Sequence, residues 1–440
     1  MPSTQPKSNH QLDLLSPLRN LNGHIAGSLK DYLWHIGLFS RNVRLFLIGS
    51  FLIGLTFATA QLLINLYLKE RGGAESFIGR FLSAGAFGTA IIAIPAAVAL
   101  RKIRLKFVLI GSTIIYMAII AAISRLGISN WLIFLSFLLG VTATFNRIAA
   151  APFFMRNSTP EERTYVFSFN FGVLLLAGMV GSVISGWLVA WFTTLLADVI
   201  QAYQWTFIIS IVCGVAAVIP FALIKAAAPT EEDRQSDFSW SLLRRQSRLY
   251  LKLLLPQFLV GIGAGLIIPF LNLYFRDRFR QSPDEIGLLF FAVNTAMLLG
   301  ILAGPVLAKK IGMVKTIVAT ELLSIPFMII LAFTYSLPMA VVAFLVRGAL
   351  MNMAQPIGTN FSMEMVGRME HALVNALLTL SWTGSWMIST VIGGRLIETH
   401  GYTLPLLIAV ALYIASAVLY YLFFRSSERK AGRDYLVEVT

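Results

Sequence analysis

Long apolar stretches alternate with short polar or basic segments along most of the chain. A helix that crosses a membrane needs about 20 mostly apolar residues, and a window of that length predicts twelve such helices. The first six expected spans are 43–68, 77–99, 105–124, 131–152, 166–192 and 203–225, and the second six are 250–275, 285–308, 313–334, 337–356, 371–396 and 403–424. A barrel strand needs only about ten alternating residues. The pattern therefore predicts an all-α polytopic membrane protein made of two six-helix bundles.

The composition supports a membrane setting and argues against several functions. Hydrophobic residues make up 57% of the chain and charged residues 13%, whereas a soluble domain carries about a quarter charged residues. The single cysteine, Cys213, excludes an intramolecular disulfide. The sequence has no phosphate-binding loop, no cluster of metal ligands and no nucleophile with a positioned base. We therefore expect no enzyme activity, no cofactor and no metal, and nothing in the sequence indicates nucleic-acid binding.

The distribution of Lys and Arg predicts the orientation in the membrane. They concentrate in "RKIRLK" (Arg101–Lys106), in "KKIGMVK" (Lys309–Lys315), in the middle linker and near both ends of the chain. Basic loops stay in the cytoplasm, so we expect an inner or plasma membrane protein with both termini on the cytoplasmic side. The net charge of +14 also favours contact with anionic membrane lipids.

A polar segment in the middle of the chain predicts the division into domains. Each half is preceded by a basic and aromatic stretch that is typical of an amphipathic helix lying on the inner membrane surface. The expected parts are a cytoplasmic arm with an amphipathic helix (1–42), a first six-helix bundle (43–225), a cytoplasmic linker with an amphipathic helix (226–249), a second bundle (250–424) and a cytoplasmic tail (425–440).

The two bundles are copies of one unit. The heptapeptide "NLYLKER" (Asn65–Arg71) recurs as "NLYFRDR" (Asn272–Arg278), and the preceding fourteen-letter stretches "FLIGLTFATAQLLI" and "FLVGIGAGLIIPFL" align without gaps. Further along, "GSVISGWL" (Gly181–Leu188) falls on "STVIGGRL" (Ser389–Leu396). The duplication predicts that the heptapeptide marks the outer end of the first helix in each copy.

Two parallel six-helix repeats joined by a charged inside linker resemble the major facilitator superfamily of secondary transporters. The resemblance covers about residues 40–425. It implies a monomer that binds a small-molecule substrate in a central cavity lined by helices 1, 4, 7 and 10, with the two halves rocking around it.

Two sequence motifs bear on gating, and both depart from the family pattern. The loop after the second helix resembles G-x-L-a-D-R-x-G-R, but Arg101 and Lys309 occupy its acidic position in the two halves. "GSVISGWL" is similar to the helix-5 antiporter motif G-P-x-x-G-G-x-L, with Ser182 in place of the proline. We therefore assign gating to Arg101, Lys309, Gly181 and Gly186, and expect contacts other than the usual charge pair to close the cytoplasmic gate.

A stripe of small and amide residues follows one face of the first helix in each copy. Its members are Gly54, Ala58, Gln61 and Asn65 in the first copy and Gly261, Gly265, Ile268 and Asn272 in the second. Small residues allow helices to pack closely, and amides can hydrogen-bond a neighbour, so packing is one interpretation. Substrate contact by Gln61, Asn65 and Asn272 is the other. Gln61 is the best candidate because its counterpart is an isoleucine.

Arg147, Arg347 and Glu321 are charged residues that lie well inside predicted spans, away from their ends. An arginine in lipid costs at least about 2.5–3.5 kcal/mol on insertion scales, so each should face the interior and be paired. Either arginine could hold helices together, attract an anionic substrate or assist proton coupling. A buried carboxyl group can exchange a proton near neutral pH, so Glu321 is our candidate for proton coupling. A structural hydrogen bond is the alternative, because its counterpart in the first copy is Thr113.

Asn294 in the eighth span and Trp382 in the eleventh complete the candidates for substrate contact, although aromatic residues in a chain with 32 Phe are more often packing residues. We expect a secondary transporter that exports an amphiphilic or drug-like organic compound by proton antiport. The alternatives are an organic-anion transporter that uses the membrane arginines, a lipid or lysolipid transporter, and a receptor or scaffold built on a transporter fold.

Overall fold

The computed structural model describes residues 39–225, 247–367 and 370–438. The N-terminal half consists of α2 (Arg41–Glu70), α3 (Glu75–Lys102), α4 (Leu105–Arg125), α5 (Asn130–Asn157), α6 (Pro160–Leu196) and α7 (Val199–Ala216), which α8 (Val218–Leu223) continues. The C-terminal half consists of α11 (Ser247–Ile267), η1 (Ile268–Phe270), α12 (Leu271–Phe279), α13 (Pro283–Ile311), α14 (Met313–Phe333), α15 (Leu337–Glu364), α16 (His371–His400) and α17 (Thr403–Glu438).

The prediction of an all-α membrane protein is confirmed. Eleven helical segments of the described chain are long and apolar enough to cross a membrane. The one expected span that is not among them, the eleventh (371–396), lies in α16, whose Ser, Thr, Gly and Trp residues lower its mean hydropathy. The last helix continues past the expected end of the span at 424 to Glu438. The amphipathic helices expected in the arm and the linker lie outside the described residues.

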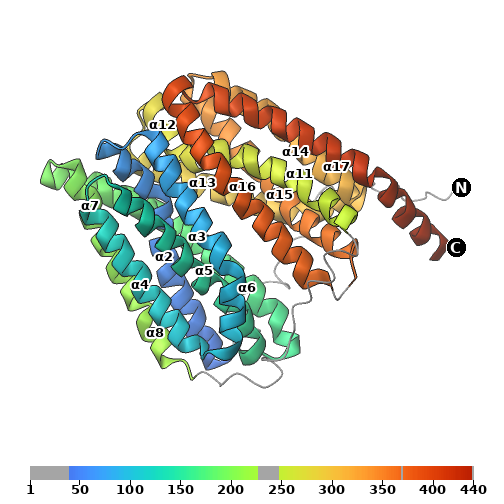
Figure 1. The fold of residues 1–440 in the computed structure, drawn as a ribbon, viewed down its shortest axis with the longest axis horizontal. Helices are drawn as coiled ribbons and strands as arrows, with labels where there is room; N and C mark the ends of the chain where they lie inside the picture. Colours follow the sequence, from blue (N-terminus) through green and yellow to red (C-terminus); the bar gives the residue numbers. More distant parts are fainter. Residues whose placement is uncertain (1–38, 226–246, 368–369, 439–440) are drawn as a thin grey trace, which may run out of the picture.

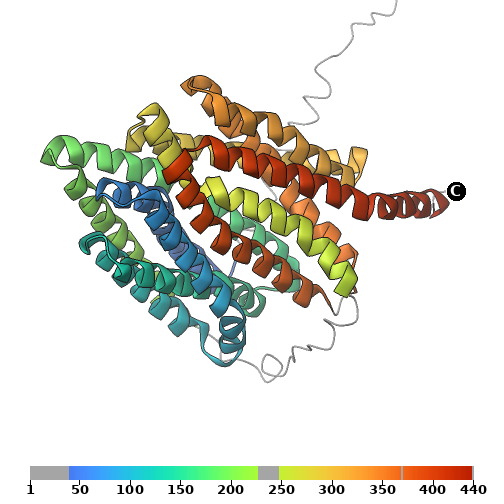
Figure 2. The same ribbon diagram turned by 45° about the horizontal axis from the view of Figure 1, so that its top comes forward.

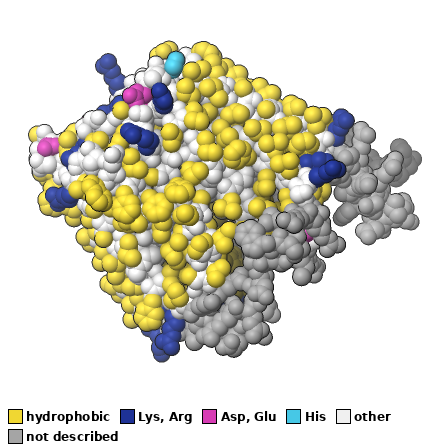
Figure 3. All heavy atoms as spheres, viewed as in Figure 1, with side chains coloured by type: hydrophobic (Ala, Val, Ile, Leu, Met, Phe, Trp, Pro, Cys, Tyr) yellow, Lys and Arg dark blue, Asp and Glu magenta, His cyan; other side chains and the backbone are white. Residues whose placement is uncertain are grey.

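The two halves form a V (Figures 1 and 2). They meet at the end where α12 lies and separate toward the other end. We call these the closed end and the open end. Helix α3 packs against α16, and α6 packs against α13, across the boundary between the halves. On the face shown in Figure 3, hydrophobic side chains cover most of the surface and charged ones lie toward its edges, as a membrane requires.

Glycines bring these crossing helices close together at the closed end. A Cβ atom on Gly79 would overlap the Thr390 carbonyl, and one on Gly394 would overlap the Glu75 carbonyl. The other boundary repeats the arrangement, because a Cβ on Gly186 would overlap the Pro283 carbonyl. Small residues let helix backbones approach without a hydrophobic driving force, so the halves touch backbone to backbone here.

The seventh span is broken where the first span is continuous. Helix α11 ends at Ile267, one 3-10 turn contains Pro269, and α12 begins at Leu271. Proline has no N–H to donate and interrupts the ladder of helix hydrogen bonds. The corresponding turn of α2, around Leu62, remains helical. The two copies therefore differ in backbone at the closed end.

Candidate functional site

Two adjoining cavities lie in the membrane region. The central cavity, of about 670 Å³, is bounded by both halves, and the C-terminal cavity, of about 530 Å³, lies mainly among α11, α14, α15, α16 and α17. They share a junction formed by Gln61, Ile268, Met297, Arg347, Asn352 and Trp386. The first, fourth, seventh and tenth spans all contribute lining residues, as the family resemblance implied.

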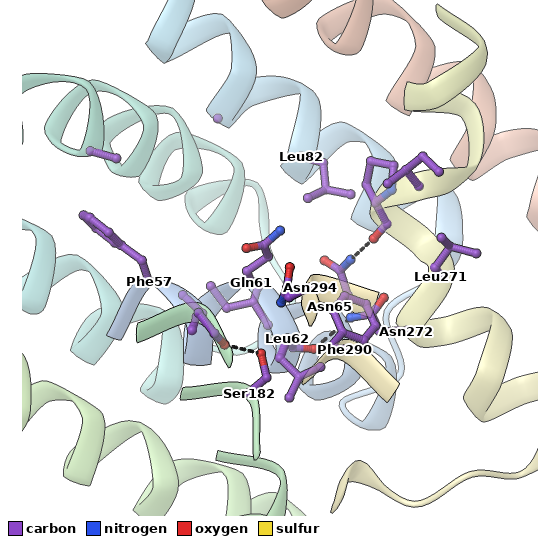
Figure 4. A pocket seen from close by; sticks show the side chains of 18 of the residues that line it. Phe57, Gln61, Leu62, Asn65, Leu82, Ser182, Leu271, Asn272, Phe290 and Asn294 are labelled. Atoms are coloured by element: carbon purple, nitrogen blue, oxygen red, sulfur yellow. Dashed lines mark hydrogen bonds between the residues drawn. The ribbon is translucent and has the colours of Figure 1, made fainter. Parts of the chain in front are cut away.

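Carboxamide side chains provide much of the polarity of the central cavity (Figure 4). Gln61, Asn65, Asn272 and Asn294 all line it. Gln61 is exposed and Asn294 is half-buried, and neither makes a hydrogen bond within the described part of the chain. Carboxamides both donate and accept hydrogen bonds, so Gln61 and Asn294 can bind a polar group whether it is neutral, anionic or cationic.

Asn65 and Asn272 instead bind the opposite half. Asn65 Nδ2 donates to the Pro269 carbonyl at 2.6 Å, and Asn272 Nδ2 donates to the Leu62 carbonyl at 2.8 Å. Each acceptor lies three residues before the other asparagine, so the two bonds are related by the internal repeat. We call this pair the asparagine clasp. The side chains lie at the closed end of the central cavity, where they both line it and join the halves.

The rest of the heptapeptide holds the same end of each half. Tyr67 Oη donates to the Ser124 carbonyl at 2.6 Å, and Tyr274 Oη donates to the Leu331 carbonyl at 2.8 Å, so each tyrosine ties its helix to the third span of its own half. Arg276 Nε reaches Glu70 Oε1 in the opposite half at 3.0 Å. The duplicated motif is therefore a closure element.

The remaining hydrogen bonds between the halves also lie toward this end. The Ser76 amide donates to Glu398 at 3.0 Å, and Ser83 Oγ donates to the Met387 carbonyl at 2.6 Å. Within the described residues, no hydrogen bond joins the halves near the open end. The structure therefore holds the central cavity shut on one side.

The small-residue stripe divides between the two interpretations. A Cβ on Gly54 would lie 2.7 Å from the Ala177 Cβ, and one on Gly181 would lie 2.7 Å from the Ala58 Cβ, so these residues pack α2 against α6. In the second copy, Gly261 and Gly265 pack α11 against α16. The amide end of the stripe lines the central cavity instead. The glycines therefore fit the packing interpretation, whereas Gln61 lines the cavity and fits the interpretation of substrate contact.

Arg347 lies at the junction of the two cavities. It is only 6% exposed, and its Nη2 donates to the Tyr413 hydroxyl at 2.7 Å, while its Nε has no partner. No carboxylate of the described chain forms an ion pair with it. The expectation that this arginine is buried is confirmed, but its protein partner is neutral. The guanidinium lines both cavities, so an anion in either cavity can approach it.

Glu321 lines the C-terminal cavity from α14. It is 4% exposed, and its Oε1 has no hydrogen-bond partner. Ser416, which donates to the Pro256 carbonyl at 3.1 Å, also contacts the carboxyl group. Glu321 thus lines the cavity and also contacts the neighbouring helix α17 of its own half. Its counterpart Thr113 is fully buried and also has an unpartnered side-chain oxygen.

Arg147 differs from the expectation that both arginines are buried and paired. Its side chain is exposed and has no partner within the described residues. Ser136, Gly140 and Ala143 line the central cavity from α5. Arg147 lies on the same face of this helix, four residues after Ala143. Arg147 therefore lies on the cavity side of its helix, nearer the open end, where water rather than a side chain can solvate it.

Trp382 lines the C-terminal cavity, and Trp386 lines both cavities. Their rings lie 5.8 Å apart, and the Nε1 of Trp386 is buried without a partner. Sequence reasoning missed Tyr413 and a set of polar residues that also line the C-terminal cavity, namely Gln257, Asn352, Gln355 and Asn375. The polarity of the four carboxamide residues within apolar spans was the signal that could have identified them.

Comparison with known proteins now settles the family. The family model of the Major Facilitator Superfamily matches residues 46–274 and again residues 253–438. The chain belongs to the major facilitator superfamily. It is therefore a multi-pass membrane transporter, and transporters of this superfamily bind small-molecule substrates and work as monomers. No curated protein matches the chain.

Solved structures of superfamily transporters share the fold. A bacterial homologue of the human lysosomal transporter Spinster, inward-facing and occupied, is 13% identical with a TM-score of 0.73, covering 87% of this chain and 96% of that one. The nucleoside transporter NupG is 13% identical with a TM-score of 0.68, covering 88% and 99%. An inward-facing bacterial homologue of the iron transporter ferroportin is 14% identical with a TM-score of 0.68, covering 86% and 98%. At these identities the likeness shows the fold alone.

The gating assignments stay predictions for this superfamily member. Gly186 packs against the Pro283 carbonyl of the other half, whereas Gly181 packs within its own half. Lys309 is exposed in the last turn of α13, away from the closed end. Arg101 lies in the last turn of α3, but its side chain is outside the described residues.

Proposed function

We propose that this transporter exports an amphiphilic organic compound that carries an anionic group, by alternating access and in exchange for protons. The apolar part of the compound occupies the central cavity, and the anionic group binds Arg347. This proposal combines the amphiphile that the composition favours with the organic anion that the membrane arginines favour.

Arg347 carries the proposal. Removing a guanidinium from water costs several kcal/mol unless it is paired. In the described part of the chain, the side-chain hydrogen-bond partner of Arg347 is the neutral Tyr413 hydroxyl. Arginine presents its donors in a fork that matches a carboxylate or a phosphate. Among the described residues, this site has one buried arginine with an unpartnered Nε, and no acidic residue lines the central cavity. It therefore suits an anionic ligand better than a cationic one.

The shape of the cavities supports an amphiphile. Most residues around the central cavity are apolar or aromatic, among them Phe57, Phe81 and Phe290. The charged group lies where this apolar chamber meets the more polar C-terminal cavity. A ligand with an apolar body and one anionic end can therefore bury its body and present its charge to Arg347.

The closed end supports alternating access. With both termini in the cytoplasm, as the sequence predicts, the asparagine clasp closes the outer side and the cavity is open to the cytoplasm, where an exported compound enters. Arg147 then lies on the entry route and raises the local concentration of anions. Glu321 is our candidate proton carrier, and the partial antiporter motif around Gly181 favours exchange over uniport.

The test compares binding and melting of purified variants. We expect naphthylpropanoate to bind and its neutral amide to bind at least tenfold more weakly. Arg347→Gln should lose about 2–5 kcal/mol of acid binding, because truncating one partner of a buried charge pair leaves the other unpaired. Arg347→Lys should lose less, since it keeps the charge without the planar fork.

Melting measured on the same samples separates ligand binding from packing. If both substitutions lower the melting temperature but leave acid binding unchanged in the folded protein, Arg347 holds helices together and the anionic substrate is wrong. If the acid and its amide bind equally, a drug-like compound that needs no anionic group becomes the favoured substrate.

A further inference from the structure

The C-terminal cavity contains two buried groups of opposite charge that are not paired with each other. Arg347 and Glu321 are 6% and 4% exposed, and both line this cavity. Arg347 Nε and Glu321 Oε1 are the atoms left without a partner. Among the described residues that line the cavity, these two are the only charged side chains.

Unpaired buried charges are unfavourable, and a fold normally relieves them by pairing. Within the described residues, the groups beside these charges are neutral hydroxyls. Tyr413 accepts a hydrogen bond from Arg347 and also lies near Glu321, and Ser416 and Tyr420 lie near Glu321 as well. The carboxyl group and the guanidinium are held on different helices, α14 and α15, and no ion pair between them forms. The cavity therefore presents a separated positive and negative group to whatever enters it.

We propose that the substrate is a zwitterion, whose anionic group binds Arg347 and whose protonated amine binds Glu321. The proposal rests on the proposed function, because it keeps the anion on Arg347, and it adds the second charged group of the substrate. The apolar part of the compound still occupies the central cavity, and Trp386, which lines both cavities, can contact it there.

The other polar residues around the cavity fit a dipolar ligand. Gln257, Asn352, Gln355 and Asn375 surround it with groups that are neutral and can donate or accept hydrogen bonds. They can complete the coordination of both ends without adding net charge. The corresponding position to Glu321 in the N-terminal half is Thr113, which carries no charge. The dipolar site therefore belongs to one half of the molecule only.

Three probes with one shared body test the proposal. Naphthylalanine carries both groups, naphthylpropanoate only the acid, and naphthylethylamine only the amine. A hydrogen bond to a charged group contributes at least about 1.4 kcal/mol, which corresponds to tenfold in affinity. We expect naphthylalanine to bind the purified transporter at least tenfold more tightly than naphthylpropanoate, as measured by titration calorimetry.

Variants assign each end of the probe. Glu321→Gln should remove the advantage of naphthylalanine over naphthylpropanoate. It should not weaken naphthylpropanoate, because it removes a negative charge from the cavity that binds the acid. Arg347→Gln should weaken both acids at least tenfold. Thr320→Val is the matched control, because Thr320 is fully buried on the same helix, bonds only within it and lines neither cavity. It should preserve the order of the three probes.

The outcomes separate this inference from the proposed function. If both acids bind equally and depend on Arg347, the anionic substrate stands and the zwitterion is refuted. If naphthylalanine keeps its advantage in Glu321→Gln, the amine binds elsewhere and the inference is again refuted. If no probe binds the parent protein in a folded state that melts cooperatively, both proposals fail. Should Glu321→Gln not fold, Glu321→Asp, which shortens the carboxylate, must reduce the advantage of the zwitterion.

Discussion

The asparagine clasp makes a quantitative prediction about the closed end. Asn65→Leu and Asn272→Leu remove one donor each and approximately keep the side-chain shape. A buried neutral hydrogen bond contributes roughly 0.5–1.5 kcal/mol, and the two bonds are 2.6 and 2.8 Å long, so we take about 1 kcal/mol for each. One substitution should then lower the ratio of closed to open molecules about fivefold, and both about 30-fold.

Spin labels report this ratio directly. Ser129 and Ser336 precede α5 and α15 at the closed end, one in each half, and neither donates a side-chain hydrogen bond. With Cys213 replaced by serine, labels at these two positions give a distance distribution by double electron–electron resonance. The long-distance population should increase in each single variant and increase further in the double variant.

A control and a thermodynamic cycle complete the experiment. Asn146 is similarly buried, but its Nδ2 donates to Ser112 Oγ within the N-terminal half at 2.8 Å, so Asn146→Leu should leave the distribution unchanged. The two clasp bonds break in the same motion, and the effect of the double variant minus the sum of the two single effects measures their coupling. If the double variant is folded and gives the parental distribution, the clasp does not hold the closed end and the reasoning is refuted.

Three further predictions address orientation, packing and coupling. An impermeant maleimide should label Ser336→Cys but not Ser427→Cys in intact cells, and the reverse result would invert the topology. In Gly394→Ala, the added methyl group should overlap the α3 backbone, destabilise the closed end by about 1–3 kcal/mol and increase the long-distance population in the same spin-label assay. Gly111→Ala should leave that population unchanged, because a Cβ at Gly111 meets nothing within 4 Å. Glu321→Gln should abolish flux driven by a pH gradient in proteoliposomes while the protein stays folded, and undiminished flux would assign Glu321 a structural role.

The sequence predicted the helices and their duplication because both depend on local pattern. Twenty-residue apolar runs have one low-energy solution in lipid, a helix whose backbone bonds are internal. The heptapeptide also revealed where the copies correspond. Its partners could not be predicted, because whether Asn65 binds a ligand or the Pro269 carbonyl depends on how the two halves are docked. That docking is tertiary information, and the break in the seventh span contributes to it.

The candidate site was predicted unevenly for the same reason. Arg347 was recognisable because a charge in an apolar span has few explanations. Arg147 has the same sequence signature, yet it is exposed, since depth along a helix does not reveal how far the halves have opened. Tyr413 escaped notice because one tyrosine among many apolar residues carries no positional signal. Its role appears only when α15 and α17 pack together and its hydroxyl meets Arg347.

The pairing of Gln61 with Ile268 has a consequence for how a ligand is oriented. These residues occupy equivalent positions in the two repeats, and both border the junction of the cavities. An unmodified duplication would surround the substrate with matching groups, so that a molecule and its half-turn image would bind equally well. Divergence at this position makes one wall polar and the opposite wall apolar. The transporter can therefore select a single pose from two that a symmetric ancestor could not distinguish.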